Sequence, residues 1–311
     1  MGVWSVALYS SDFALDLRST ISAVLRLPFN EEQLIDAICE AEAQSAENPD
    51  DEDYSTFWLV LADQLAKRGL PATRAREMAL RIIDSGADLA SLEKRGAQAA
   101  DLKKRSAVLQ ELRTRLVTAQ PVTRPRAVLK KPQPFLMEVG DVVCYPTSHG
   151  KVINAYAKPE QLVKPNTPLF WNHDGYGAFV VVNRGRAFDY LTWYRYVKLA
   201  KAMPEIPAIG ALRNEELLWV LSLGGTCSAT HFKRMRFEKL GTFTVDRAKL
   251  LNVFPAMRPS HKQAISDISI CNHLDALPSL MSYALAPPGT PERERRGRNL
   301  TLRGIAQILS D

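Results

Sequence analysis

The first 118 residues carry apolar side chains at helical spacing. An apolar stripe at residues 13–21 follows Ser10-Ser11-Asp12, which predicts a helix with an N-cap in front of it. Asn30 predicts the cap of a second helix, and the stripe at residues 57–65 predicts a later one. A long helix is expected over residues 88–118, weakened locally by Gly96. We therefore predict a helical domain over residues 1–118.

A proline-rich segment ends the helical pattern. Residues 120–134 hold four prolines among basic side chains, which is typical of an extended linker, and we assign residues 119–134 to it. Beyond it the apolar period changes from helical to two, which predicts short strands over residues 135–250. The sequence thus favours an α+β protein with a small antiparallel, barrel-like β domain.

The second half contains a predicted turn followed by a predicted strand. Asn183-Arg184-Gly185-Arg186 predicts a turn, and residues 187–199 predict a strand rich in aromatic side chains. The pattern becomes helical again near Ser260, so we assign residues 251–311 to a helical C-terminal extension. Residues 300–309 are expected to form its last helix.

Charge is unevenly distributed along this basic chain of net charge +6. Residues 1–70 hold 13 acidic against 4 basic side chains, a net of −9, and residues 71–131 hold 6 against 14, a net of +8. A basic chain suggests a nucleic-acid partner. However, the acidic and basic segments could equally neutralise each other within the fold.

The well-known catalytic and metal-binding motifs are missing from the sequence. It has no phosphate-binding glycine loop, no Gly-x-Ser-x-Gly elbow, no His-Glu-x-x-His and no paired Cys-x-x-Cys. Two weak alternatives are a Cys144 nucleophile and a zinc site, for which the candidate ligands are Cys227, His231, Cys271 and His273. Structural burial explains both sets more simply, so no cofactor, no metal and no catalytic residue is expected.

Four widely spaced cysteines and the lack of a secretory signal or long apolar run predict a reduced, cytoplasmic protein that does not cross a membrane.

Two groups of residues are candidates for binding a protein partner. The acidic run of Asp50, Asp51, Glu52 and Asp53 is either a solvated lead into a helix or a docking patch for a basic partner. Tyr190, Trp193 and Arg195 combine stacking surfaces with a cation, which suits an interface anchor, although packing within a sheet explains them as well. Candidates for contact with nucleic-acid phosphates are Lys103, Lys104, Arg105, Arg295 and Arg296.

The N-terminus resembles a bacterial family of unknown function. Met1-Gly2-Val3-Trp4 is followed by Asp12, Ala14 and Asp16, as in the family's Met-Gly-x-Trp opening and Asp-x-Ala-x-Asp element. The resemblance covers about the first seventy residues and implies no chemistry. We expect Trp4 to fill the helical core and Asp12 to cap the first helix.

A second stretch is similar to an immunity protein class of bacterial polymorphic-toxin systems, the immunity protein 26-like class. It comprises residues 138–146, with the pattern Gly-Asp-Val before a proline, then the glycine turn and strand of residues 150–156, and Phe237-x-x-x-Gly241 near the end. The resemblance spans residues 135–250. It implies a protein that binds its toxin stoichiometrically and has no catalytic residues.

These observations lead to one expected function and one alternative. The expected function is a non-enzymatic antagonist that occludes a cognate, nuclease-like toxin. Its acidic segment would imitate nucleic-acid phosphates, and Trp193 would anchor the partner. The alternative is a nucleic-acid-binding component of a bacterial defence system.

Overall fold

The computed structural model describes residues 6–118, 125–153, 173–220, 224–253, 261, 265, 274 and 300–310. The chain divides into two compact units, residues 1–131 and 132–311, and the division falls inside the segment expected to be a linker. Each unit is described by itself. No helix of the described ranges is long and apolar enough to cross a membrane.

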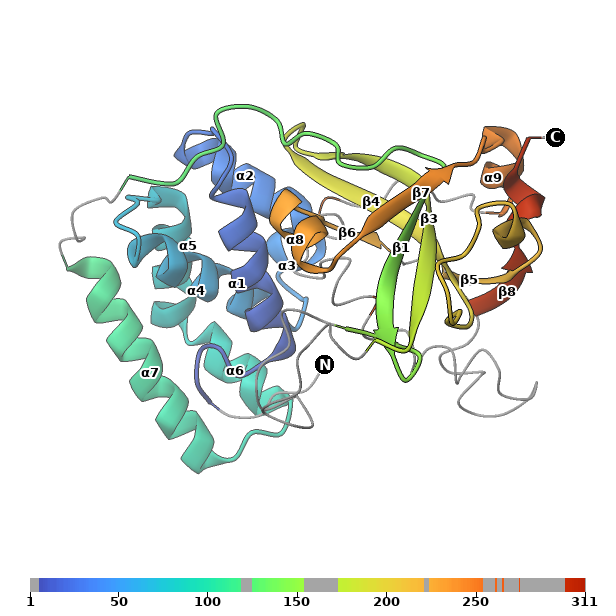
Figure 1. The fold of residues 1–311 in the computed structure, drawn as a ribbon. Coiled ribbons are helices and arrows are strands. Elements are labelled where there is room, and N and C mark those ends of the chain that lie inside the picture. Colours follow the sequence, from blue (N-terminus) through green and yellow to red (C-terminus); the bar gives the residue numbers. More distant parts are fainter. Residues whose placement is uncertain are drawn as a thin grey trace. The chain divides into compact units, whose positions relative to one another are not determined.

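The regular secondary structure in the described part of the first unit is helical (Figure 1). Its helices are α1 (Asp12–Val24), α2 (Glu31–Ala41), α3 (Ala43–Glu47), α4 (Tyr54–Ala66), α5 (Thr73–Ser85), α6 (Ala87–Lys94) and α7 (Ala99–Val117). Helix α4 is its centre, because every residue from Phe57 to Leu65 is buried and α1, α3, α5, α6 and α7 all contact it. A helix that is apolar on all sides requires such a surrounding shell.

The predicted N-cap of α2 is confirmed, whereas the expectation that Asp12 caps α1 is wrong by one residue. The Ser11 side chain accepts a hydrogen bond from the Ala14 amide at 3.1 Å, so Ser11 and not Asp12 is the cap. Asn30 and Gln33 form a capping box, in which each side chain accepts a hydrogen bond from the other's backbone amide at 3.0 Å. These bonds satisfy amides that have no partner inside the helix.

The prediction of a single long helix over residues 88–118 is wrong. Gly96 has a φ of +90°, and α6 ends there while α7 begins at Ala99. The Ala97 amide donates to the Leu92 carbonyl and the Gly96 amide to the Glu93 carbonyl, which is a glycine-dependent helix end. Gly96 therefore terminates a helix where only a local weakening was expected.

Several ion pairs connect the acidic first segment to the basic second one. Arg115 contacts Asp63 at 2.8 Å, and Arg74 contacts Asp36 at 2.8 Å. Asp63 is buried in α4 and also pairs with Lys67. Part of the charge asymmetry is thus neutralised inside the helical unit.

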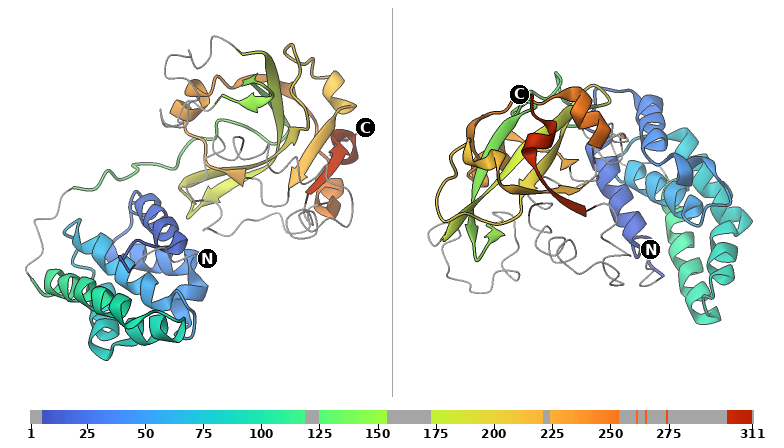
Figure 2. Two further views of the ribbon diagram at one scale, coloured as in Figure 1. Left: turned by 90° about the horizontal axis from the view of Figure 1, so that it is seen from below. Right: turned by 90° about the vertical axis from the view of Figure 1, so that its right-hand side faces the viewer.

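The second unit is built on one antiparallel sheet. Its strands are β1 (Asp141–Ser148), β2 (Lys151–Val152), β3 (Gly175–Ala187), β4 (Leu191–Leu199), β5 (Glu216–Val220), β6 (Gly224–Gly225), β7 (Glu238–Thr242) and β8 (Leu300–Gly304). The strand order is β2-β1-β3-β4-β5-β8, with β7 also paired to β1 and β6 to β4. Figure 2 shows these strands from two further sides, coloured from green at β1 to red at β8. Helices α8 (Ala229–Arg234) and α9 (Arg247–Val253) and the 3₁₀ turns η2 (Ala211–Arg213) and η3 (Ile305–Ile308) complete its described part. The fold is α+β, and its described strands do not close into a barrel.

Both faces of the sheet are buried. Val143, Tyr145 and Phe179 belong to one core cluster, while Val142, Cys144 and Val180 belong to the other. This strict alternation along β1 and β3 follows from the two-residue period of a strand. Phe237 also packs in the first cluster, and Ile305 and Ile308 of η3 pack in the second.

The turn predicted at residues 183–186 is wrong, because β3 continues through it to Ala187. Gly185 lies under the indole of Trp193, where a Cβ would meet the ring at 2.5 Å, so this glycine serves close packing. The chain turns at Phe188 and Asp189, which have positive φ values of 49° and 61°. Stacking of Phe188 on His261, with ring centroids 4.0 Å apart, stabilises this unfavourable backbone.

The C-terminal helix predicted over residues 300–309 is also wrong. Residues 300–304 form β8, which pairs with β5, and residues 305–308 form the 3₁₀ turn η3. Val245 forms an isolated bridge with Leu309, so the end of the chain is held by backbone hydrogen bonds. Most of the extension predicted over residues 251–311 lies outside the described residues.

Candidate functional site

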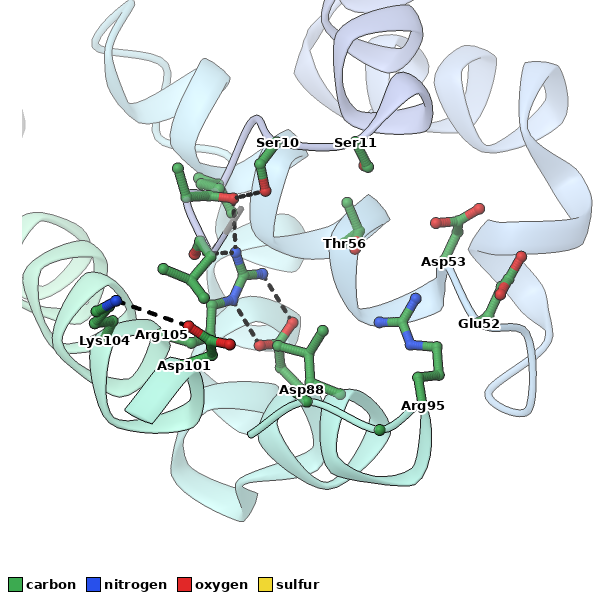
Figure 3. A pocket seen from close by; sticks show the side chains of 16 residues that line it. Ser10, Ser11, Glu52, Asp53, Thr56, Asp88, Arg95, Asp101, Lys104 and Arg105 are labelled. Carbon is green, nitrogen blue, oxygen red and sulfur yellow. Dashed lines mark hydrogen bonds and ion pairs between the residues drawn. The ribbon is translucent and has the colours of Figure 1, made fainter. Parts of the chain in front are cut away.

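The strongest candidate site is a pocket of about 630 Å³ in the helical unit (Figure 3). Three parts of the chain line it: the segment before α1, the acidic loop that precedes α4, and the α6–α7 corner. Its volume is within the range that ligand-binding pockets have. Its polar lining side chains are Ser10, Ser11, Glu52, Asp53, Thr56, Asp88, Arg95, Asp101, Lys104 and Arg105.

A buried ion pair forms one wall of the pocket. Arg105 of α7 contacts both carboxylate oxygens of Asp88 in α6, at 2.8 and 2.9 Å. The same guanidinium donates to the carbonyls of Val6 and Ala7 at 3.2 and 3.1 Å. Both side chains are almost fully buried, so this pair joins α6, α7 and the segment before α1.

The acidic loop is held in shape by one of its own carboxylates. Asp51 accepts hydrogen bonds from the Ser45 hydroxyl at 3.1 Å and from the Asp53 amide at 2.9 Å. The Asp53 carbonyl accepts a hydrogen bond from the Phe57 amide at 2.8 Å, and this is the first backbone hydrogen bond of α4. The loop therefore presents Glu52 and Asp53 to the pocket in a fixed conformation.

Asp53 is the unusual residue of this pocket. It is 8% exposed, yet its carboxylate forms no hydrogen bond or ion pair within the described chain. Burial, followed by the nearby charges of Glu52 and Asp51, raises the pKa of Asp53, and the positive charge of Arg95 partly opposes that effect. A buried carboxylate is costly unless it is paired, so this group favours a cationic partner.

The opposite wall carries the cations. Arg95, at the end of α6, bonds its own helix through the Ser91 carbonyl at 3.3 Å and extends its guanidinium toward Asp53 (Figure 3). Lys104 contacts Asp101 at 3.8 Å on the surface of α7. With the Asp88–Arg105 and Asp101–Lys104 pairs set aside, two carboxylates and one guanidinium face the pocket.

This arrangement suits recognition of a cation. The pocket offers carboxylate acceptors and the hydroxyls of Ser11 and Thr56. Ser11 already caps α1 with its side chain. A lysine or arginine side chain would supply the charge and the donors that Asp53 can accept.

The four residues of the predicted acidic run have different positions in the structure. Glu52 and Asp53 line the pocket, Asp51 is used inside the loop, and Asp50 is exposed beyond the lining.

The basic residues predicted to contact phosphates also differ in their exposure. Lys103 and Lys104 are exposed on α7, whereas Arg105 is buried against Asp88 and is not part of an exposed basic face. Arg295 and Arg296 lie outside the described residues.

The aromatic candidates belong to the other unit. Tyr190 lies in the turn between β3 and β4, while Trp193 and Arg195 lie in β4 and are only 8% and 9% exposed. The expectation of Trp193 as an exposed anchor is corrected, since its ring packs on Gly185.

The cysteine alternatives gain no support from the described residues. Cys144 is buried in the sheet, where desolvation raises its thiol pKa to about 11. Cys227 is buried in the other core cluster, and Cys271 and His273 lie outside the described residues. No cluster of three or more metal-ligating side chains occurs in the described part of the chain.

Sequence reasoning missed Arg95 and Thr56. Arg95 follows a helix that ends at a glycine, and Thr56 lies in the first turn of α4, so both positions depended on helix boundaries that the pattern did not locate. No family model, curated protein or solved structure matches the chain.

Proposed function

We propose that this chain is a non-enzymatic binding protein that antagonises a protein toxin by stoichiometric occlusion. The observation that carries the proposal is the Asp53 carboxylate. It is buried, it has no partner among the described residues, and it lines the pocket. An arginine or lysine side chain of the partner enters this pocket and pairs with Asp53. Glu52 adds a second negative charge at its edge.

The charge of the surrounding segment supports this mode of binding. Residues 1–70 carry a net charge of −9, although Asp63 and Asp36 are paired with arginines inside the unit. The remaining acidic side chains attract a basic partner and accelerate its association. A basic cleft that normally holds nucleic acid has the complementary charge, which is why a nuclease-like toxin is the proposed class of partner.

The resemblance of residues 135–250 to immunity proteins supports the toxin as partner and the lack of catalysis. In this proposal the helical unit supplies the acidic pocket. The β unit contributes contact area, and its buried Trp193 acts by supporting the strand surface.

The experiment is an affinity capture with the full chain from the cytoplasm of its host, with and without nuclease treatment. The proposal predicts one nuclease-resistant protein retained at about one copy per chain, which is toxic when expressed alone and harmless when expressed with this protein. The matched variants are Asp53→Asn, which removes the pocket charge, and Asp50→Asn, which removes an exposed charge outside the pocket. Retained nucleic acid without a protein partner, or equal capture by both variants, contradicts the proposal.

A further inference from the structure

The pocket of the helical unit carries charges of both signs that are not paired within the described chain. Once the two ion pairs of its wall are set aside, the charged side chains that line it are Glu52, Asp53 and Arg95. A ligand in this space therefore meets two carboxylates and one guanidinium. The volume of about 630 Å³ lies in the range of sites for small molecules.

The negative charges come from one loop. Asp53 is 8% exposed and lines the pocket without a hydrogen bond or ion pair to a described residue. Glu52 precedes it and is exposed, so it lies where the pocket opens to solvent. A buried carboxylate without a partner is costly, so the position of Asp53 favours a bound cation.

The positive charge comes from the end of α6. The Nε of Arg95 donates to the Ser91 carbonyl at 3.3 Å, and its two terminal amino groups point toward Asp53 (Figure 3). The charge of Arg95 acts on Asp53 across the pocket, but no ion pair joins the two residues within the described chain. Asp53 and Arg95 therefore bound the same space from two sides.

We propose that this pocket binds a free basic amino acid. The side-chain cation pairs with Asp53, the α-ammonium pairs with Glu52, and the α-carboxylate pairs with Arg95. A guanidinium suits this last role, because its planar donors match the two oxygens of a carboxylate. The inference rests on the pocket of the proposed function, and a bound amino acid competes there with the basic side chain of the protein partner.

The balance of charge favours this ligand over simpler cations. Two carboxylates and one guanidinium give the unpaired lining one net negative charge, and a basic amino acid carries one net positive charge. A metal ion or a diamine would pair with Asp53 and Glu52 but would be repelled by Arg95. A ligand with its own carboxylate satisfies all three side chains.

The test is equilibrium dialysis of labelled L-arginine against the full chain at neutral pH and physiological ionic strength. The unlabelled competitors are agmatine, which lacks the α-carboxylate, and citrulline, which lacks the side-chain cation. The protein variants are Asp53→Asn and Arg95→Gln. Lys94→Gln is the matched control for Arg95→Gln, because Lys94 is exposed in the last turn of α6 and does not line the pocket.

We expect one L-arginine per wild-type chain, displaced about tenfold less effectively by agmatine or citrulline than by unlabelled L-arginine, as the loss of one charged contact predicts. Arg95→Gln should bind L-arginine about tenfold more weakly and lose the preference over agmatine. Asp53→Asn should weaken binding at least as much, and Lys94→Gln should bind as wild type does.

Three results would overturn the inference: no binding of L-arginine to the wild-type chain, equal competition by agmatine and L-arginine, or unchanged binding by Arg95→Gln. Equal competition by agmatine would still leave Asp53 as a site for a cation. The proposed function fails by a different result, the absence of a captured protein partner.

Discussion

The Asp88–Arg105 pair provides the most quantitative test of the site's structure. Arg105→Met removes both contacts at 2.8 and 2.9 Å to Asp88 and the two bonds to the carbonyls of Val6 and Ala7. It leaves the Asp88 carboxylate, 2% exposed, without its counter-charge. Breaking a buried pair from one side costs about 3–5 kcal/mol, so we expect the free energy of unfolding of the helical unit to fall by about 4 kcal/mol.

A double-mutant cycle separates the pair from its surroundings. Asp88→Leu alone leaves Arg105 buried with only the two backbone carbonyls, and we expect a loss of about 3 kcal/mol. The double variant Asp88→Leu/Arg105→Met buries no unpaired charge, so its loss should be smaller than the sum of the single losses by at least ~2 kcal/mol.

The assay is urea unfolding of the full chain, followed by circular dichroism at 222 nm. Helices α1 to α7 of the first unit provide most of the helical signal from the described residues. Losses that add within about 0.5 kcal/mol would refute the coupling, as would single variants that unfold at the wild-type midpoint.

Three further predictions concern the second unit. Gly140→Ala should destabilise it by at least about 3 kcal/mol in the same urea assay, because φ is +92° and a Cβ would lie 2.0 Å from the Phe243 carbonyl oxygen. The control Gly150→Ala should cost only about 1 kcal/mol, because Gly150 has a φ of +71° but open space around it. Cys144, with its thiol pKa raised to about 11, should react with iodoacetamide at pH 8 roughly a hundredfold more slowly than a free thiol, and mass spectrometry showing an ordinary rate would contradict its burial. Lys198 has its pKa lowered from 10.5 to about 8, so the folded state binds fewer protons than the unfolded state between these values. In chloride buffer, stability should therefore rise with pH across that window by about 3 kcal/mol relative to Lys198→Met, and parallel pH profiles of the two proteins would disprove it.

The sequence predicted those helices whose signals are local. Asn30 was identifiable as a cap, and the cap of α1 was located to within one residue, because a cap acts on amides two or three residues away. Gly96 was noticed, but its effect depended on whether the backbone there takes a positive φ, which helix periodicity does not report. The period of two also located β1 and β4, whose side chains alternate between the two cores.

The failures came where distant packing decides the local structure. Gly185 was taken as a turn residue, but the indole of Trp193 from the neighbouring strand needs the space above it. Residues 300–309 have apolar positions that fit a helix, yet β5 offers a free edge that makes residues 300–304 a strand.

The candidate site was only partly predictable for a similar reason. The acidic run was visible in the sequence, but its division into Asp51, which orders the loop, and Asp53, which faces the pocket, depends on contacts with α3 and α6.

The central claim is that Asp53 recognises a basic side chain of a protein partner. The most direct measurement is the dissociation rate of the captured partner from the immobilised full chain, compared among wild type, Asp53→Asn and Asp50→Asn at physiological salt. Truncating one side of a buried charge pair costs about 2–5 kcal/mol and acts mainly on dissociation. We therefore predict at least ~30-fold faster release from Asp53→Asn, with Asp50→Asn within about twofold of wild type. Equal dissociation rates for all three proteins would contradict the claim.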